Sequence, residues 1–326
     1  MRIRGECAIL WRQQGVSQIG TSPAQRTIVS GLSLAEQRLL DELARSLEAG
    51  GIYRAARRTR VPVKRARQLV KELERQGALV SSATTELDGA DGVYWDRLGA
   101  DAKRRGAALS QAVLALHGVS ALAQEAALWL AEAGVGTILS TRAPKDGGLE
   151  PLLSARFPAL RTRAPLRTRP DVMVTVDAHV VEPLLARRLA QEGIIHLPVV
   201  VGEAGVRVGP VLGGGGPCST CLELWERDAD PCWPALATQM RTLPMPDVEH
   251  LVLHESAALA ARAVVDTLLG QAPPVEDAAG GCGGTGDPTG GSALWWAMHS
   301  VEVDGRDPLG RRRAWQRHPE CLCSQL

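Results

Sequence analysis

The chain has 326 residues, of which 45% are hydrophobic and 22% are charged, and its 37 basic and 36 acidic side chains leave a net charge of +1. This balance excludes a protein whose whole surface binds nucleic acid, and the plentiful apolar residues exclude a disordered chain. No apolar run reaches the roughly 18 residues of a membrane span and no signal peptide is recognisable, so we expect a cytoplasmic two-domain protein without a membrane partner.

Residues 1–81 are expected to combine three short strands with three helices. Apolar runs separated by turn residues predict the strands, at 7–11, 16–20 and 26–30. Ser33, followed by Glu36 three residues later, forms a capping-box pattern at the start of the first helix. Two further helical segments follow, at 52–59 and 63–79. This order of elements predicts a winged-helix domain.

A polar segment rich in glycine and aspartate, 82–107, is expected to be a connector. From 108 to 326 strands alternate with helices, which predicts a parallel sheet with helices on its faces, the Rossmann-type α/β arrangement. The expected strands are 112–118, 135–140, 171–178 and 197–203, with a strand-rich tail from 294, and the expected helices are 120–134, 181–193 and 253–269. The glycine-rich segment 273–292 is expected to be a loop.

The turn after the first strand of this second domain is the place where a Rossmann-type fold binds phosphate. A binding loop carries glycines there, because bare backbone must approach the phosphates at a helix N-terminus. Here Gly118 remains, but Ser120 and Ala123 occupy the second and third glycine positions. The second strand ends in LSTR (139–142), without an acid for the ribose hydroxyls. We therefore expect the fold without bound ATP.

Four cysteines in two pairs are the strongest chemical signal in the sequence. Cys218 and Cys221 have CxxC spacing, and Cys321 and Cys323 lie about a hundred residues later. Two such pairs can supply the four corners of a zinc tetrahedron, which predicts a structural zinc site that attaches the tail to the domain. The alternatives are a redox-active CxxC and thiols that merely pack.

The remaining cysteines, Cys7, Cys232 and Cys282, are interpreted as packing or surface thiols, and His318 as a substitute metal ligand or a structural residue. The other histidines are scattered without a motif. Neither a nucleophile elbow nor a pair of carboxylates is recognisable, so no catalytic residues are predicted.

Basic residues dominate the second and third helices of the first domain. No acid separates Arg54, Arg57, Arg58, Arg60, Lys64, Arg65, Arg67 and Lys71. One interpretation is a recognition helix that reads DNA, and another is a solvated helix face. A third is a groove for an acidic peptide, which adds as a strand to the exposed edge of the small sheet.

Several of these segments also resemble a known family. The stretch GGGGPCSTCLELWERDADPCWPALATQM (213–240) and the ending RRRAWQRHPECLC (311–323) resemble actinobacterial Ocin-ThiF-like proteins, also called bacteriocin-biosynthesis cyclodehydratase-domain or TOMM precursor leader-peptide-binding proteins. The segments LHGVSALAQEAALWLAEAGVGTI and PDVMVTVDAHVVEP are similar to the ThiF-type adenylating fold more generally. The resemblance covers essentially the whole chain.

The resemblance implies a protein that binds the leader of a ribosomally made precursor peptide and presents it to a YcaO-type cyclodehydratase, which performs the azoline chemistry. It also implies zinc at Cys218, Cys221, Cys321 and Cys323, and a homodimer. The ATP residues of ThiF-type proteins are not matched, so a non-catalytic partner is expected rather than an adenylating enzyme. An ATP-dependent adenylating enzyme and a winged-helix DNA-binding regulator remain the alternatives.

Within the first domain, which resembles the family's peptide-recognition element, the sequence predicts where a leader binds. Its backbone pairs with the outer edge of the third strand, and its side chains reach the third helix. The predicted contacts are Arg26, Thr27, Ile28 and Val29 on the strand and Arg65, Gln68, Leu69 and Glu72 on the helix. In this arrangement Leu69 contacts apolar side chains of the peptide and Arg65 contacts acidic ones.

Overall fold

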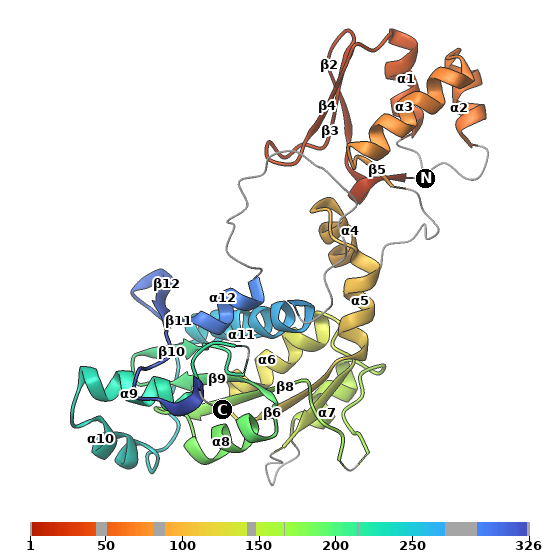
Figure 1. The fold of residues 1–326 in the computed structure, drawn as a ribbon. Helices are drawn as coiled ribbons and strands as arrows, with labels where there is room; N and C mark the ends of the chain where they lie inside the picture. The colour runs from red at the N-terminus through yellow and green to blue at the C-terminus, as the bar shows by residue number, and fades with distance from the viewer. Residues whose placement is uncertain are drawn as a thin grey trace. The chain divides into compact units, whose positions relative to one another are not determined.

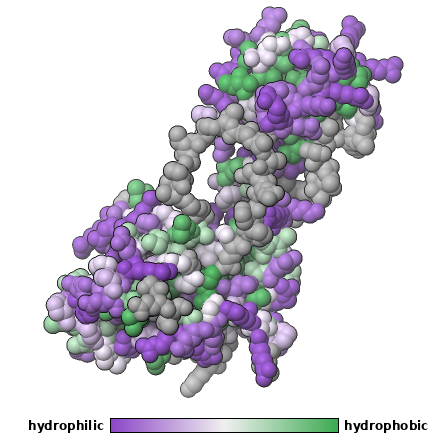
Figure 2. All heavy atoms as spheres, in the orientation of Figure 1, coloured by the Kyte–Doolittle hydropathy of each residue, from purple (hydrophilic) through white to green (hydrophobic). Residues whose placement is uncertain are grey.

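The computed structural model describes residues 2–43, 51–80, 89–141, 148–165, 167–213, 215–270 and 292–324. Cys282 and nearly all of the expected glycine-rich loop lie outside these ranges. The described residues up to Gly106 form one compact unit and those from Ala107 onward form a second (Figure 1). None of the described helices combines the length and the apolar composition that crossing a membrane demands. On the visible face of each unit, Figure 2 shows mainly hydrophilic side chains interspersed with hydrophobic ones.

The first unit contains a three-stranded antiparallel sheet in the order β2-β3-β4. The strands are β2 (Ile9–Gln13), β3 (Val16–Ile19) and β4 (Thr27–Ser30). β2 begins later than expected, because the residues before it form a 3₁₀ turn, η1 (Arg4–Glu6). One face of the sheet carries the buried side chains of Ser17, Ile19 and Val29, while Ile28 on the other face is 44% exposed. β4 is therefore an edge strand with one buried and one exposed face.

Three helices pack on the buried face around a core of leucines. They are α1 (Leu34–Leu43), α2 (Gly51–Thr59) and α3 (Val63–Arg75), and a short pairing of β1 (Arg2–Ile3) with β5 (Leu79–Val80) closes the unit. The predicted capping box is confirmed: the Ser33 N–H donates to Glu36 Oε2 at 2.6 Å, and the Glu36 N–H donates to Ser33 Oγ at 3.2 Å. The strands and helices occur in the expected order, and the winged-helix assignment remains a prediction.

Part of the expected connector is helical. It contains α4 (Gly89–Arg97) and most of α5 (Ala102–Gln111). Asp96 on α4 accepts hydrogen bonds from the Gly5 N–H and from Arg2, and the Arg97 guanidinium donates to the Gly5 carbonyl at 2.7 Å. These contacts with the chain's first residues order a segment whose composition suggested a linker.

The second unit is built on a seven-stranded mixed sheet in the order β12-β11-β10-β9-β8-β6-β7. The strands are β6 (Val113–His117), β7 (Thr137–Ser140), β8 (Val172–Ala178), β9 (Ile195–Val201), β10 (Gly205–Val208), β11 (His299–Asp304) and β12 (Asp307–Ala314). β6 to β9 are parallel, as expected for an α/β fold, but the prediction of a parallel sheet is wrong for the other half. β9 pairs antiparallel with β10, and β11 with β12, because these two connections are too short for a crossover. β10 and β11 are also antiparallel, although a long segment with several helices joins them.

Helices cover both faces of this sheet. α6 (Ala121–Glu132) and α11 (His250–Gly270) pack against each other on one face, and α8 (Pro183–Gln191) lies on the opposite face (Figure 1). The unit also contains α7 (Leu149–Arg156), α9 (Ser219–Ala229), α10 (Trp233–Met240) and α12 (Ser292–Met298). α12 occupies the start of the tail that was expected to form strands, because Trp296 packs into the core and its Nε1–H donates to Asp266.

Candidate functional site

The four predicted metal-ligating cysteines meet at one point of the second unit. Cys218 immediately precedes α9 and Cys221 lies in its first turn, while Cys321 and Cys323 come from the tail after β12. The Sγ–Sγ distances are 3.8 Å for Cys218 and Cys221, 3.6 Å for Cys218 and Cys321, and 3.5 Å for Cys221 and Cys323. All four sulfur atoms lie within 4.8 Å of one another.

This spacing matches a tetrahedral thiolate site. Zn–S bonds of about 2.3 Å place the sulfurs of a tetrahedron roughly 3.8 Å apart. Burial raises the pKa of the Cys321 and Cys323 thiols, whereas for Cys221 the backbone N–H groups of His318 and Cys218 outweigh burial and lower the pKa. A cation among the sulfurs favours the thiolate at all four positions. The cluster can therefore hold a metal ion such as zinc.

His318 supports the cluster and is not one of its ligands. Its ring is buried, its Nδ1 accepts from the Glu320 N–H at 3.1 Å, and its Nε2 therefore donates to Asp228 at 2.9 Å. Its backbone carbonyl accepts from the Cys321 N–H. The Trp225 ring meets the imidazole in an edge-to-face arrangement, with the ring centres 4.7 Å apart. The interpretation of His318 as a substitute ligand is wrong, because both ring nitrogens are already used to shape the loop.

A second set of contacts joins α9 to the strands beside it. Glu226 on α9 pairs with Arg313 on β12 at 2.7 Å and with Arg207 on β10 at 3.5 Å. The Arg313 guanidinium lies 3.9 Å from the ring centre of Trp315, which is itself buried and donates to Ser300 at 2.9 Å. The residues that lead to Cys321 are therefore attached to the sheet and to the helix that begins at Cys218.

In the turn that was compared with a phosphate-binding loop, a side chain of the turn itself binds a backbone N–H group of the following helix. Ser120 is the N-cap of α6, and its hydroxyl accepts from the Ala123 N–H at 3.3 Å. Gly118 has φ +151°, and a Cβ there would lie 3.1 Å from Val176, so the chain itself requires this glycine. Ser120, at the second glycine position, therefore satisfies one of the N–H groups at the start of α6 that a phosphate-binding loop leaves free for its ligand.

Polar residues gather at the carboxyl ends of the parallel strands, and the sequence analysis did not single them out. The Thr141 hydroxyl donates to the Leu116 carbonyl, so the His117 Nδ1–H donates to Thr141 at 2.8 Å. On β8, burial raises the pKa of Asp177, and its carboxylate lies 2.7 Å from the Thr175 hydroxyl. The signal in the sequence was positional: these residues end neighbouring parallel strands, where open α/β sheets bind ligands.

The predicted peptide contacts on β4 lie on an open strand edge. The Gly20 N–H donates to the Ala8 carbonyl, so in this register Gln18 also bonds toward β2. Antiparallel ladders alternate, so the N–H and C=O of Ile28, which faces Gln18, point away from the sheet. Arg26 is exposed, Thr27 is half-buried, and Val29 faces the core.

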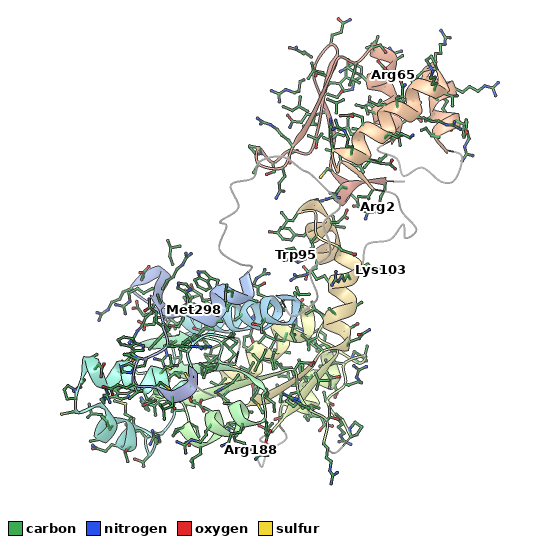
Figure 3. All side chains as sticks on the ribbon, in the orientation of Figure 1. Arg2, Arg65, Trp95, Lys103, Arg188 and Met298 are labelled. Carbon is green, nitrogen blue, oxygen red and sulfur yellow. The ribbon has the colours of Figure 1, made fainter. Side chains whose placement is uncertain are left out.

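On α3 the structure changes the roles that were predicted. Leu69 is 3% exposed and packs in the core of the first unit, so it offers no surface to a peptide and its predicted contact with one is wrong. Arg65, labelled in Figure 3, pairs with Glu36, whose carboxylate also caps α1. Gln68 is exposed, and Glu72 binds Arg75 and Gln76.

Two further cysteines have separate environments. Cys7 is half-buried, and burial raises the pKa of its thiol. Cys232 is exposed at the start of α10. Neither belongs to the four-cysteine cluster.

Comparisons with known proteins place this geometry in a wider context. No family model and no curated protein matches the sequence. Among solved structures, the chain matches microcin C7 biosynthetic enzyme MccB in complex with N-formylated MccA, with a TM-score of 0.61, 12% identity and 98% of each chain covered. It matches E. coli MccB with ATP at a TM-score of 0.59, with 12% identity and the same coverage.

A third match is a heterocyclase in complex with substrate and cofactor. Its TM-score is 0.67 at 15% identity, and the match covers 98% of this chain but 39% of that one. The chain thus spans about two fifths of the length of the heterocyclase. At these identities the likeness shows the fold alone. The chain therefore shares the fold of MccB over nearly its whole length, and the assignment to actinobacterial Ocin-ThiF-like proteins remains a prediction.

Proposed function

We propose that the protein binds the leader of a ribosomally synthesised precursor peptide and presents it to a YcaO-type cyclodehydratase for azoline or azole formation. The observation that carries the proposal is the open edge of β4, with the Ile28 amide directed outward and its side chain 44% exposed. An edge of this kind accepts a peptide as an additional strand. The shared fold supports the proposal, because MccB was solved with MccA and the heterocyclase with its substrate.

In this proposal the first unit is a winged-helix peptide-recognition domain, and its peptide contacts differ from the expected set at Leu69 and at Glu72, whose carboxylate is bound by Arg75 and Gln76. The peptide pairs with the backbone of residues 26–29, and Ile28 replaces Leu69 as the apolar contact, since Leu69 is buried. Gln68 and Arg65 lie one turn apart on α3 and supply polar contacts. The second unit contributes the cysteine site, which holds zinc in a structural role, and the protein acts as a homodimer without turning over ATP.

The edge of β4 can be tested with one substitution and its control. Ile28→Pro removes an outward N–H without breaking the β3–β4 ladder, so it should weaken binding of a precursor leader peptide more than tenfold. Ile28→Val keeps the amide, the strand propensity and an apolar side chain, and should bind within about threefold of the parent. Fluorescence anisotropy with the labelled leader gives both affinities. Equal binding by parent and Ile28→Pro would remove β4 from the proposal.

ATP-dependent adenylation of a peptide is the second candidate. It is favoured by His117, Thr141 and Asp177 at the carboxyl ends of the parallel strands, and by the fold that the chain shares with MccB, which was solved with ATP. Against it, Ser120 occupies the second glycine position and bonds to the Ala123 N–H.

Calorimetry with ATP and Mg²⁺ separates the two candidates. We expect no heat of binding, because the loop offers no bare backbone to the phosphates. Micromolar binding of ATP, or pyrophosphate exchange in the presence of the leader peptide, would establish the adenylating enzyme instead.

A further inference from the structure

A pocket in the second unit lies where two helices meet the last hairpin. Its volume is about 320 Å³, and it is lined by Leu259, Asp266, Trp295, Trp296, Val301, Leu309 and Arg312. These residues come from α11, α12, β11 and β12, close to Met298, which Figure 3 labels at the end of α12. The lining combines two tryptophans with aliphatic side chains, and charged groups lie at two places only.

The two charged groups of the pocket have different partners. The Asp266 carboxylate accepts from the Trp296 Nε1–H at 3.2 Å and lies 3.7 Å from Arg262. Arg312 lies over the Trp295 ring at 5.7 Å, and no carboxylate of the described residues is within ion-pairing distance of it. Its neighbours differ in this respect, because Arg311 pairs with Asp304 and Arg313 pairs with Glu226. Arg312 thus leaves a positive charge at an apolar pocket.

The pocket adjoins an open strand edge. β12 ends the seven-stranded sheet, and the Trp315 N–H donates to the Met298 carbonyl. The alternation of the antiparallel ladder then directs the N–H groups of Arg313 and Arg311 toward β11, and those of Ala314 and Arg312 away from the sheet. Arg312 therefore offers its backbone to the free edge and its side chain to the pocket.

A bulge in the hairpin brings a further apolar residue, Leu309, to the same pocket. The register of β11 and β12 shifts between Glu302 and Asp304, and Gly310 has φ +64°. Between the pairs Glu302–Arg311 and Asp304–Asp307, β12 contains two more residues than β11. In a regular strand Leu309 and Arg312, three positions apart, would point to opposite faces, whereas here both line the pocket. Leu309 is 85% exposed, so its side chain is accessible to a bound chain.

We propose that β12 is a second peptide-binding edge, which binds an extended peptide carrying an acidic residue and an aromatic or large aliphatic residue two positions apart. The peptide backbone pairs with Arg312 and Ala314. Residues two apart on a strand share a face, so the acidic side chain meets Arg312 and the apolar one enters the pocket beside Trp295 and Leu309. This surface lies in the second unit and is independent of the function proposed for β4.

The probe for this edge is the labelled synthetic peptide Thr-Phe-Thr-Glu-Thr-Phe-Thr-Glu-Thr, in which phenylalanine and glutamate share one face. The full-length protein should bind it in an anisotropy titration, and should bind the same peptide with lysine in place of glutamate at least tenfold more weakly. Raising the salt concentration should reduce this preference, because part of it comes from the charge at Arg312. Absence of binding, or equal binding of the two peptides, would overturn the proposal.

Variants then locate the binding on the surface. Arg312→Glu should weaken binding of the acidic peptide more than tenfold, while Arg306→Glu, in the turn of the same hairpin, should leave it unchanged. Ala314→Pro removes an outward N–H and should also weaken binding more than tenfold, whereas Ala314→Ser should not. Near-ultraviolet circular dichroism identifies any variant that has lost its fold. If Ile28→Pro abolishes binding of this probe and Arg312→Glu does not, the peptide binds at β4 and the inference is wrong.

Discussion

His196 on β9 has a buried imidazole whose two nitrogens have different surroundings. Its Nε2 lies 2.9 Å from the Thr175 hydroxyl, which is in turn 2.7 Å from Asp177, and its Nδ1 has no partner among the residues described. Burial disfavours the charged ring and lowers the pKa to about 4. The histidine therefore stays neutral inside the folded protein at a pH where it is protonated in the unfolded chain.

The consequence is a loss of stability in weak acid. Below pH 6.5, the ordinary histidine pKa, the imidazole is protonated in the unfolded chain, whereas in the folded chain it stays neutral down to about pH 4. The free energy of unfolding therefore falls as the pH drops from 6.5 to about 4. At pH 5 this single group costs about 2 kcal/mol relative to pH 7. His196→Gln should reduce the difference between the unfolding free energies at pH 7 and pH 5 by that amount in guanidinium titrations.

The raised pKa of Asp177 has the opposite effect on stability, which it increases as the pH falls. Because the parent and His196→Gln both contain Asp177, this effect cancels when their pH dependences are compared. An unchanged pH dependence in His196→Gln would show that the imidazole is protonated within the fold.

Among single residues, the sequence predicted those whose role depends on local spacing. It did not predict those whose role depends on contacts between distant parts of the chain. The four cysteines were found because a metal site needs particular side chains at short spacing, and the Ser33–Glu36 box because capping is local. Leu69 was misplaced although the sequence held the signal: with Ala66, Val70 and Leu73 it forms the apolar stripe of α3, which the helical period directs into the core. Asp177 and His117 were missed because strands separated in sequence bring them together.

Among the elements, α9 and the tail after β12 depend on each other through the cysteine cluster. Elemental analysis should find about one zinc per chain, as a closed four-thiolate site requires. Cys221→Ser should lower Tm by roughly 10 °C, since a unit of this size shifts by about 2–4 °C per kcal/mol and losing a ligand of a structural site costs several kcal/mol. Differential scanning calorimetry and limited proteolysis of the tail measure the two effects.

The matched control is Cys232→Ser, which changes an exposed cysteine outside the cluster and should leave both zinc content and Tm unchanged. A zinc-free preparation that melts at the same temperature as the parent would exclude a structural metal.

The elements themselves were predicted well where hydrophobic period decides them, as in the four parallel strands β6 to β9 and the helix α11. The antiparallel half of the sheet was not predicted, because β10 has only four residues and β12 is rich in arginine. Strand pairing there follows from the short hairpin connections, a property that composition does not report. The residues of α12 were expected to form a strand, because tryptophan is common in strands. Their helix depends on the packing of Trp296 against α11, which the sequence does not reveal.

On the scale of the whole molecule, the balance of charge argues against duplex DNA as the partner. In the basic segment, Arg58 pairs with Glu42 and Arg65 with Glu36, so two of its cations are already neutralised. We expect affinities for random duplex DNA no tighter than about 10⁻⁶ M at physiological salt, which is the range of non-specific binding.

An electrophoretic mobility assay across a salt series measures this affinity, and the leader peptide serves as competitor. If DNA binds at nanomolar concentration with a steep salt slope while the leader does not bind, the DNA-binding regulator is the correct function.

The cysteine cluster also has a consequence for the order in which the second unit assembles. Cys218 and Cys221 are neighbours in sequence, but Cys218 and Cys321 are 103 residues apart, so closing the second loop costs about 3 kcal/mol more chain entropy than closing the first. We therefore expect the tail to reach the CxxC pair late, after β11 and β12 have joined the sheet. A metal ion held by all four sulfurs would then add most of its stabilisation after the folding barrier, and would slow unfolding more than it accelerates folding.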